Sequence, residues 1–177
     1  MESARVRAAV ATMVAIAIGP MPARGAAPGG NGVQACRPVP GTTLEQFYPA
    51  MPGWIRGQPT SETDPQEAVS RTTVDFDRKT ETVSVEIMDS CRSADVLMLM
   101  RETLKQFPPA TPGTTQRHTT VNTFPAYEEF TAESGHGEMH VLVADRFMVK
   151  VTVETSDVAT LRNAATLIPM QKLAAMP

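Results

Sequence analysis

Alternating apolar and polar residues predict a first β-hairpin in the N-terminal half of the chain. Residues 68–75 and 82–89 alternate, and residues 77–80 form the polar turn between them. A period of two places the following apolar residues on one side: Val74, Phe76, Val83, Val85 and Ile87. We therefore expect a hairpin with one buried face and one hydrated face.

A second hairpin is predicted between residues 138–144 and 147–155. Its two apolar sets match only if Val143 lies opposite Phe147, which needs a three-residue connection or a bulge. A two-residue turn would instead set Val141 against Lys150. The pattern therefore predicts both the pairing of the two strands and its register.

The longest predicted helix covers residues 94–107, between a Ser93 cap and a pair of prolines. Its apolar set is wider than one core-facing stripe needs: Val96, Leu97, Met98, Leu99, Met100, Leu104 and Phe107. Core packing is the simpler interpretation. The alternative is that Leu97, Met98 and Met100 belong to a surface for a ligand or partner.

Shorter patterns complete the expected fold. Residues 115–121 and 126–132 indicate two further strands, which makes about five to six in all. Thr42-Thr43-Leu44-Glu45 fits a capping box for a short helix through Tyr48. Ser156 is expected to cap a last helix at residues 157–168, followed by a short turn of helix to Leu173. This order predicts an α+β domain at residues 42–177, with helices packed on an antiparallel β-sheet.

The N-terminus has the features of a secretory signal peptide at residues 1–27. Arg5 and Arg7 precede an apolar run at residues 8–18, which is too short to span a bilayer, and small residues follow near 25–27. Residues 28–41 are rich in Pro and Gly and indicate a flexible lead-in. We therefore expect an exported protein, periplasmic or secreted.

A lipoprotein is the alternative form of export, because residues 33–36 loosely match a lipobox that ends at Cys36. Cys36 and Cys91 are the two cysteines of the chain. In an oxidising compartment they are expected to form one disulfide.

Composition excludes some classes of function. The chain has 177 residues, 42% of them hydrophobic, and a net charge of −3. It shows no basic cluster for a phosphate backbone, so nucleic-acid binding is not expected. No segment after the leader is apolar enough for a transmembrane helix.

The chain also resembles a group of small exported bacterial proteins that have no assigned activity. The similar segments are Pro49-Ala50-Met51-Pro52-Gly53-Trp54, VSVEIMD at residues 83–89, and Asp145-Arg146-Phe147-Met148-Val149. The element order resembles the PsbP/Mog1-like α+β sandwich, whose members are mostly binding or assembly modules. The resemblance thus implies a binding role and supplies no functional residue.

The stretch SGHGEMHV, residues 134–141, holds the strongest candidates for chemistry. His136, Glu138 and His140 have side chains that bind transition metals, with His118 as a further ligand from another strand. The glycines indicate a turn at residues 134–137. On a strand the two histidines would lie too far apart for one ion unless the turn bends His136 back toward Glu138.

No local catalytic motif is present. The chain lacks G-x-S-x-G and glycine-rich phosphate loops, and adjacent Glu128 and Glu129 would point to opposite faces of a strand. Trp54, the lone tryptophan, either fills the edge of the core or lines a ligand groove. We therefore expect a non-enzymatic binding or envelope-accessory module without a cofactor, which binds an envelope protein or a small ligand. The alternative is a periplasmic metal-binding protein.

Overall fold

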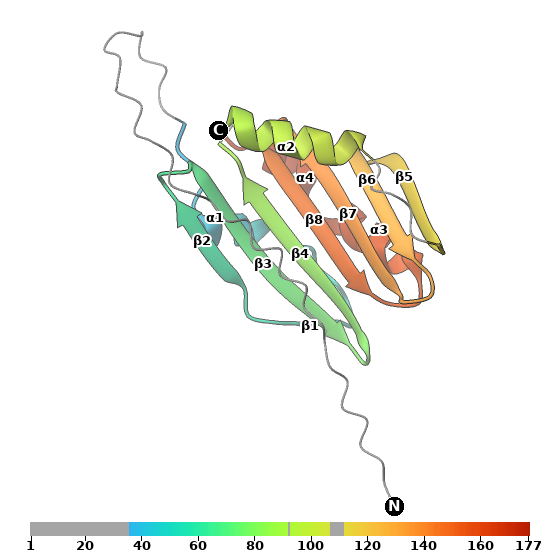
Figure 1. The fold of residues 1–177 in the computed structure, drawn as a ribbon. Helices are drawn as coiled ribbons and strands as arrows, with labels where there is room; N and C mark the ends of the chain where they lie inside the picture. The colour runs from blue at the N-terminus through green and yellow to red at the C-terminus, as the bar shows by residue number, and fades with distance from the viewer. Residues whose placement is uncertain (1–35, 92, 107–111) are drawn as a thin grey trace, which may run out of the picture. The chain divides into compact units, whose positions relative to one another are not determined.

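Eight antiparallel strands form one sheet in the computed structural model, which describes residues 36–91, 93–106 and 112–177 (Figure 1). The strands are β1 (Ile55–Arg56), β2 (Thr60–Asp64), β3 (Val69–Arg78), β4 (Glu81–Asp89), β5 (Thr114–Val121), β6 (Phe124–Thr131), β7 (His136–Val143) and β8 (Phe147–Glu154). Their order is β1–β3–β4–β8–β7–β6–β5, and β2 also pairs with β3. The predicted signal peptide and the start of the lead-in, residues 28–35, lie outside the described residues.

The predicted α+β class with an antiparallel sheet is confirmed, but the predicted number of strands is too low. The two strands that the sequence pattern misses are β1 and β2, which both pair with β3 at the sheet edge. All five residues of β2 are exposed, so no apolar alternation marks this strand. Backbone pairing alone defines such an edge strand, and a hydropathy pattern cannot detect it.

Both predicted hairpins form, but the turn of the first is shorter than the predicted 77–80, because Asp77 and Arg78 already pair with Thr82 and Glu81. In the first, Val74 pairs with Val85 and Phe76 with Val83. In the second, Val143 pairs with Phe147 across a three-residue connection, and the Arg146 amide donates to the Val143 carbonyl. Matching of the apolar faces therefore did set the register of β7 and β8.

The turn before β7 differs from the sequence-based expectation. It occupies residues 132–135, and His136 is already the first residue of the strand. Gly135 has φ +71°, which a turn requires, whereas Gly137 lies inside β7 because a Cβ there would come 2.7 Å from Phe130 Cδ2. The second glycine thus reflects close packing and not a turn.

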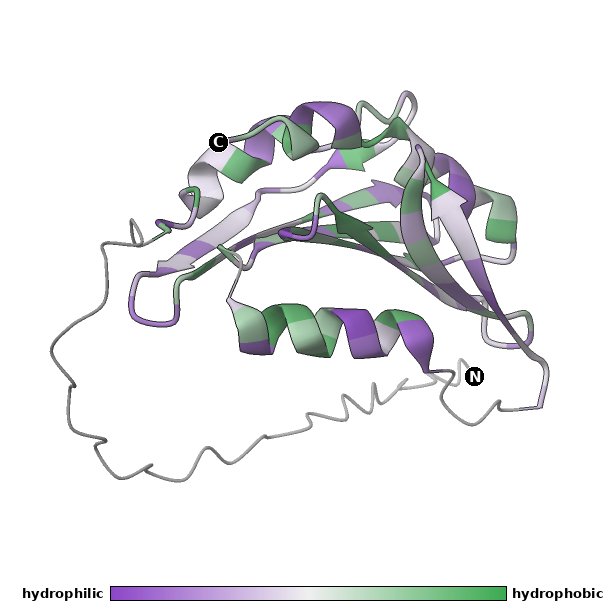
Figure 2. Cartoon of the chain, turned by 90° about the horizontal axis from the view of Figure 1, so that it is seen from above, coloured by the Kyte–Doolittle hydropathy of each residue, from purple (hydrophilic) through white to green (hydrophobic). Residues whose placement is uncertain are grey.

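Helices cover the two faces of the sheet unequally (Figure 2). The elements α1 (Gly41–Leu44), α3 (Val158–Leu167) and α4 (Met170–Ala174), with the 3-10 turn η1 (Glu45–Phe47), pack on one face. The helix α2 (Ala94–Lys105) lies alone on the other face, over β6 and β7. We call these the covered face and the open face.

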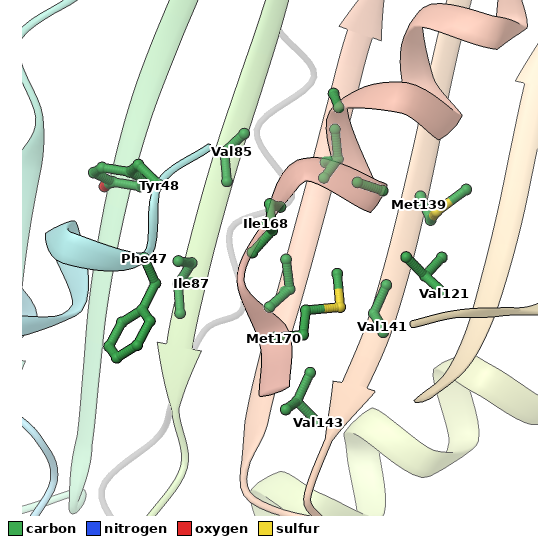
Figure 3. Close-up of a cluster of buried hydrophobic side chains, with 14 of the residues drawn as sticks. Phe47, Tyr48, Val85, Ile87, Val121, Met139, Val141, Val143, Ile168 and Met170 are labelled. Atoms are coloured by element: carbon green, nitrogen blue, oxygen red, sulfur yellow. The ribbon is translucent and has the colours of Figure 1, made fainter. Parts of the chain in front are cut away.

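The main core lies between the covered face and its helices (Figure 3). It joins residues of η1 and α4 to inward-facing residues of β4, β7 and β8, including Phe47, Ile87, Val141 and Met170. A smaller core lies under α2, where Leu97 and Met100 pack on Leu142 and Met148.

Two of the predicted helix starts differ in detail. Pro40 precedes α1 and no side chain caps it, so the predicted capping box does not form. The helix α3 is capped by Asp157 and not by Ser156. The Asp157 carboxylate accepts a hydrogen bond from the Ala159 amide at 2.8 Å. Asp is an equally good cap, and it places the helix start one residue later.

The predicted disulfide is confirmed: Cys36 and Cys91 are bonded, across a sequence separation of 55. Beside it, the buried Asp89 carboxylate accepts hydrogen bonds from the Val39 and Cys91 amides and from the Arg146 guanidinium. The described end of the lead-in is thereby fixed to the end of β4 and to the β7–β8 turn.

Candidate functional site

The candidate site is a pocket of about 290 Å³ beside Trp54, between the segment before β1 and the helix α3. Its apolar lining residues are Met51, Pro52, Trp54, Ala164 and Leu167. Its polar lining residues are Arg78, Asp157, Thr160 and Asn163.

A tight turn presents Trp54 to this pocket. The Trp54 amide donates to the Met51 carbonyl at 3.2 Å, and Gly53 has φ +81°. Glycine adopts this conformation readily, so Pro52-Gly53 can reverse the chain directly before the tryptophan. The indole packs against the main core and is only partly buried. The indole therefore fills the edge of the core and also lines the pocket, whereas a role in ligand binding stays a prediction.

Arg78 holds the indole from the end of β3. Its guanidinium carbon lies 4.3 Å from the centroid of the Trp54 ring, within the range of a cation–π contact. The same guanidinium forms an ion pair with Glu81 at 2.9 Å, and Glu81 accepts a hydrogen bond from Thr155 at 2.6 Å. These contacts lower the pKa of Glu81, with the Thr155 hydrogen bond as the largest cause. Through Arg78 and Glu81, the Trp54 indole is thus connected to the first hairpin and to the end of β8.

The helix α3 forms the opposite wall. Successive turns place Thr160, Asn163, Ala164 and Leu167 toward the pocket. Leu167 remains 50% exposed and adds an apolar side chain to this wall. No sequence motif marks these four residues, because it is the packing of α3 on the sheet that brings them to the pocket.

Both charged lining residues of the pocket have partners within the protein: Arg78 contacts Glu81 and Trp54, and Asp157 caps α3. Asp157 is the single carboxylate among the lining residues that the structure describes, and it is engaged as the α3 cap. The pocket therefore presents a mainly polar surface that also includes the partly exposed apolar side chains of Trp54 and Leu167.

The predicted metal-binding residues lie elsewhere, on the open face. His136, Glu138 and His140 alternate along β7 and share this face. One carboxylate lies between the two rings: Glu138 Oε1 is 3.6 Å from His136 Nε2, and Glu138 Oε2 is 3.2 Å from His140 Nε2. His136 is therefore close to Glu138, although it lies in the strand and not in a turn.

Other charged groups complete this cluster. Lys150 Nζ lies 2.9 Å from Glu138, and His136 Nδ1 lies 2.8 Å from Glu154. The hydrogen bond with His140 is the largest cause that lowers the pKa of Glu138 to about 2, with Lys150 adding to it and burial opposing it. The cluster is thus a network of hydrogen bonds across β7 and β8 with an ion pair between Glu138 and Lys150.

Metal binding by these residues stays a prediction. Across the described ranges, no three or more His, Cys, Asp or Glu side chains are grouped in a way that could hold a metal ion. An ion at Glu138 would have to displace Lys150 from the carboxylate. His118 lies on β5 and is separated from His140 by Tyr127 of β6, with 6.2 Å between neighbouring ring centroids.

The predicted partner surface on α2 is divided by the fold. Leu97 and Met100 are buried against the sheet, whereas Met98 and Leu99 are 60% and 68% exposed. The excess of apolar residues in α2 therefore consists of one buried stripe and two outward-facing side chains.

Glu128 and Glu129 point to opposite faces, as predicted. Glu128 is buried on the covered face and pairs with Arg117 of β5 and Arg162 of α3. These contacts lower its pKa against the opposing effect of burial, which is the largest single cause. Glu129 accepts a hydrogen bond from the Tyr127 hydroxyl.

No helix in the described part of the chain is long and apolar enough to cross a membrane. Comparison with family models, with curated proteins and with solved structures finds no match for this chain.

Proposed function

We propose that this protein is an exported, non-enzymatic module that binds a small ligand or a segment of an envelope protein in the pocket beside Trp54. The pocket is the observation that carries the proposal, because it combines a partly exposed tryptophan, an exposed leucine and several hydrogen-bonding groups. Tryptophan and arginine side chains are also frequent anchors in binding interfaces.

Export is supported by two independent features. The N-terminal sequence has the charge and length of a cleavable leader. The Cys36–Cys91 disulfide agrees with an oxidising compartment. The resemblance to exported bacterial proteins and to the PsbP/Mog1-like sandwich favours the same role.

The lone tryptophan makes the binding proposal testable without knowledge of the natural ligand. The probe is 1-anilinonaphthalene-8-sulfonate, an apolar dye whose sulfonate suits Arg78. Excitation of Trp54 should produce saturable energy transfer to the bound dye. Leu167→Asp should abolish it, because this change places a charge in the apolar wall.

The matched control is Met98→Asp, which alters an apolar residue of similar exposure on α2, on the other face of the sheet. This variant should retain the energy transfer. Loss of transfer in Met98→Asp but not in Leu167→Asp would reject the Trp54 pocket as the site.

Metal binding at β7 is the second candidate, because two imidazoles flank one carboxylate there. Metal-free protein would then take up one equivalent of Zn²⁺ or Cu²⁺ in a calorimetric titration, and His140→Ala would remove the uptake. His118→Ala is the control that should retain it. Absence of stoichiometric uptake by the unaltered protein would reject this candidate.

A further inference from the structure

The two edges of the sheet differ in how they are protected. At one edge, β1 has two residues and β2 has five, and Gly57-Gln58-Pro59 separates them. Glu62 and Asp64 add charge to β2. Short strands, proline and charge are the usual means by which proteins prevent pairing at a sheet edge.

The other edge has neither the short strands nor the proline, and its strand β5 carries one charged residue, Arg117. The strand β5 pairs with β6 over eight consecutive residue pairs, and within the described residues it has no other strand partner (Figure 1). It reads TTQRHTTV, which contains neither proline nor glycine and includes four threonines that favour β-structure. A regular strand of this length offers backbone groups on which a further strand can pair.

We propose that β5 pairs antiparallel with β5 of a second copy of this chain, so that the two sheets become continuous. A two-fold axis normal to the sheet keeps the two covered faces on one side of the continuous sheet. Residues that lie opposite each other must then point to the same face, so their numbers are both odd or both even. The axis must therefore pass through a residue opposite its own copy, and only Arg117 or His118 lies near the middle of the strand.

Charge decides between these two registers. An axis at Arg117 would set two guanidinium groups directly opposite each other, which is unfavourable. An axis at His118 instead sets Arg117 opposite Thr119, Gln116 opposite Thr120, and Thr115 opposite Val121, without a pair of like charges among them. The strand is thus complementary to itself in the His118 register, which is why a second copy suits this edge better than an unrelated peptide.

Charge changes at Thr119 test both the dimer and its register. Thr119→Lys sets a lysine opposite Arg117 at two symmetric places and should raise the dimer dissociation constant about tenfold in sedimentation experiments. Thr119→Glu sets a carboxylate there and should lower the same constant. Thr120→Lys is the control: it adds the same charge opposite neutral Gln116, and the constant should stay within about twofold.

Cross-linking provides a second measurement that does not depend on affinity. His118→Cys places two thiols opposite each other at the axis and should give a disulfide-linked dimer under mild oxidation. Thr120→Cys should not, because its partner position is Gln116. A protein that stays monomeric up to its solubility limit would overturn the proposal. So would a dimer that responds alike to Thr119→Lys and Thr119→Glu.

Discussion

Arg78 lies over the ring of Trp54, with its guanidinium carbon 4.3 Å from the ring centroid. This contact joins the first hairpin to the wall of the candidate pocket, so the position of the indole depends on the sheet. Arg78→Leu should therefore shift and broaden the Trp54 emission and destabilise the fold by about 1 kcal/mol. A matched change, Arg56→Leu, removes the similar contact over Tyr48 at 5.0 Å. It should leave the tryptophan emission unchanged; equal effects of the two variants would contradict this role for Arg78.

Glu138 should make the free energy of unfolding depend on pH. The pKa of Glu138 is about 2 in the folded protein and 4.5 in a free glutamate side chain. The Glu138 carboxylate therefore binds a proton more weakly in the folded state than in the unfolded state. The resulting stabilisation is present above about pH 4.5 and is lost as the pH falls toward 2. We expect Glu138→Gln to remove about 2 kcal/mol at pH 7 and little at pH 2, as measured by urea unfolding.

The control for this prediction is Glu133→Gln, in the exposed turn before β7. Its unfolding free energy should follow that of the unaltered protein at both pH values. A Glu138→Gln variant with the same loss of unfolding free energy at pH 2 and pH 7 would show that the charge of Glu138 beside His140 and Lys150 does not stabilise the fold.

The Cys36–Cys91 disulfide should stabilise the domain by restricting the unfolded chain. A loop with a sequence separation of 55 corresponds to about 4 kcal/mol in the loop-entropy description. The double variant Cys36→Ser/Cys91→Ser should lose this amount in denaturant unfolding, and a reducing agent should have no further effect on it. If reduction of the unaltered protein changes its unfolding midpoint very little, the bond does not stabilise the fold.

Asp89 and Arg146 form a buried ion pair at 2.9 Å, with almost no exposure of either side chain. Asp89→Ala leaves a buried guanidinium without its carboxylate and also removes the acceptor for two backbone amides. We expect a loss of about 3–5 kcal/mol in thermal or urea unfolding. The exposed pair of Arg71 and Glu62 offers the comparison, and Glu62→Ala should cost well under 1 kcal/mol. Similar losses of stability in the two variants would contradict the expected difference between the buried and the exposed ion pair.

The sequence predicts those parts of the fold in which apolar periodicity determines burial. The register of Val143 and Phe147 is one example, because a slip by one residue would turn one of the two apolar sets to the opposite face. The edge strand β2 is the opposite case: its side chains are all exposed, and only hydrogen bonds to β3 define it. Gly137 misled the prediction of the turn because packing against Phe130, and not backbone conformation, requires glycine there.

The candidate site was predictable only in part. Trp54 and its Pro-Gly turn are visible in the sequence, whereas Thr160, Asn163 and Leu167 are brought to it by the docking of α3 on the sheet. That docking depends on tertiary contacts such as the Arg162–Glu128 ion pair, which no local pattern contains. Conversely, the histidines of β7 formed the most conspicuous local pattern, and in the structure their ring nitrogens are engaged with Glu138 and Glu154.

The most direct test of the binding proposal is the single indole N–H resonance of Trp54 in a titration followed by nuclear magnetic resonance. With 1-anilinonaphthalene-8-sulfonate as the probe, we predict a saturable shift of this resonance together with the side-chain amide of Asn163. Leu167→Asp should abolish both shifts, while the signals of α2 remain in place. If the Trp54 and Asn163 signals stay fixed at saturating dye, or if only residues around Met98 and Leu99 respond, the proposed binding site is wrong.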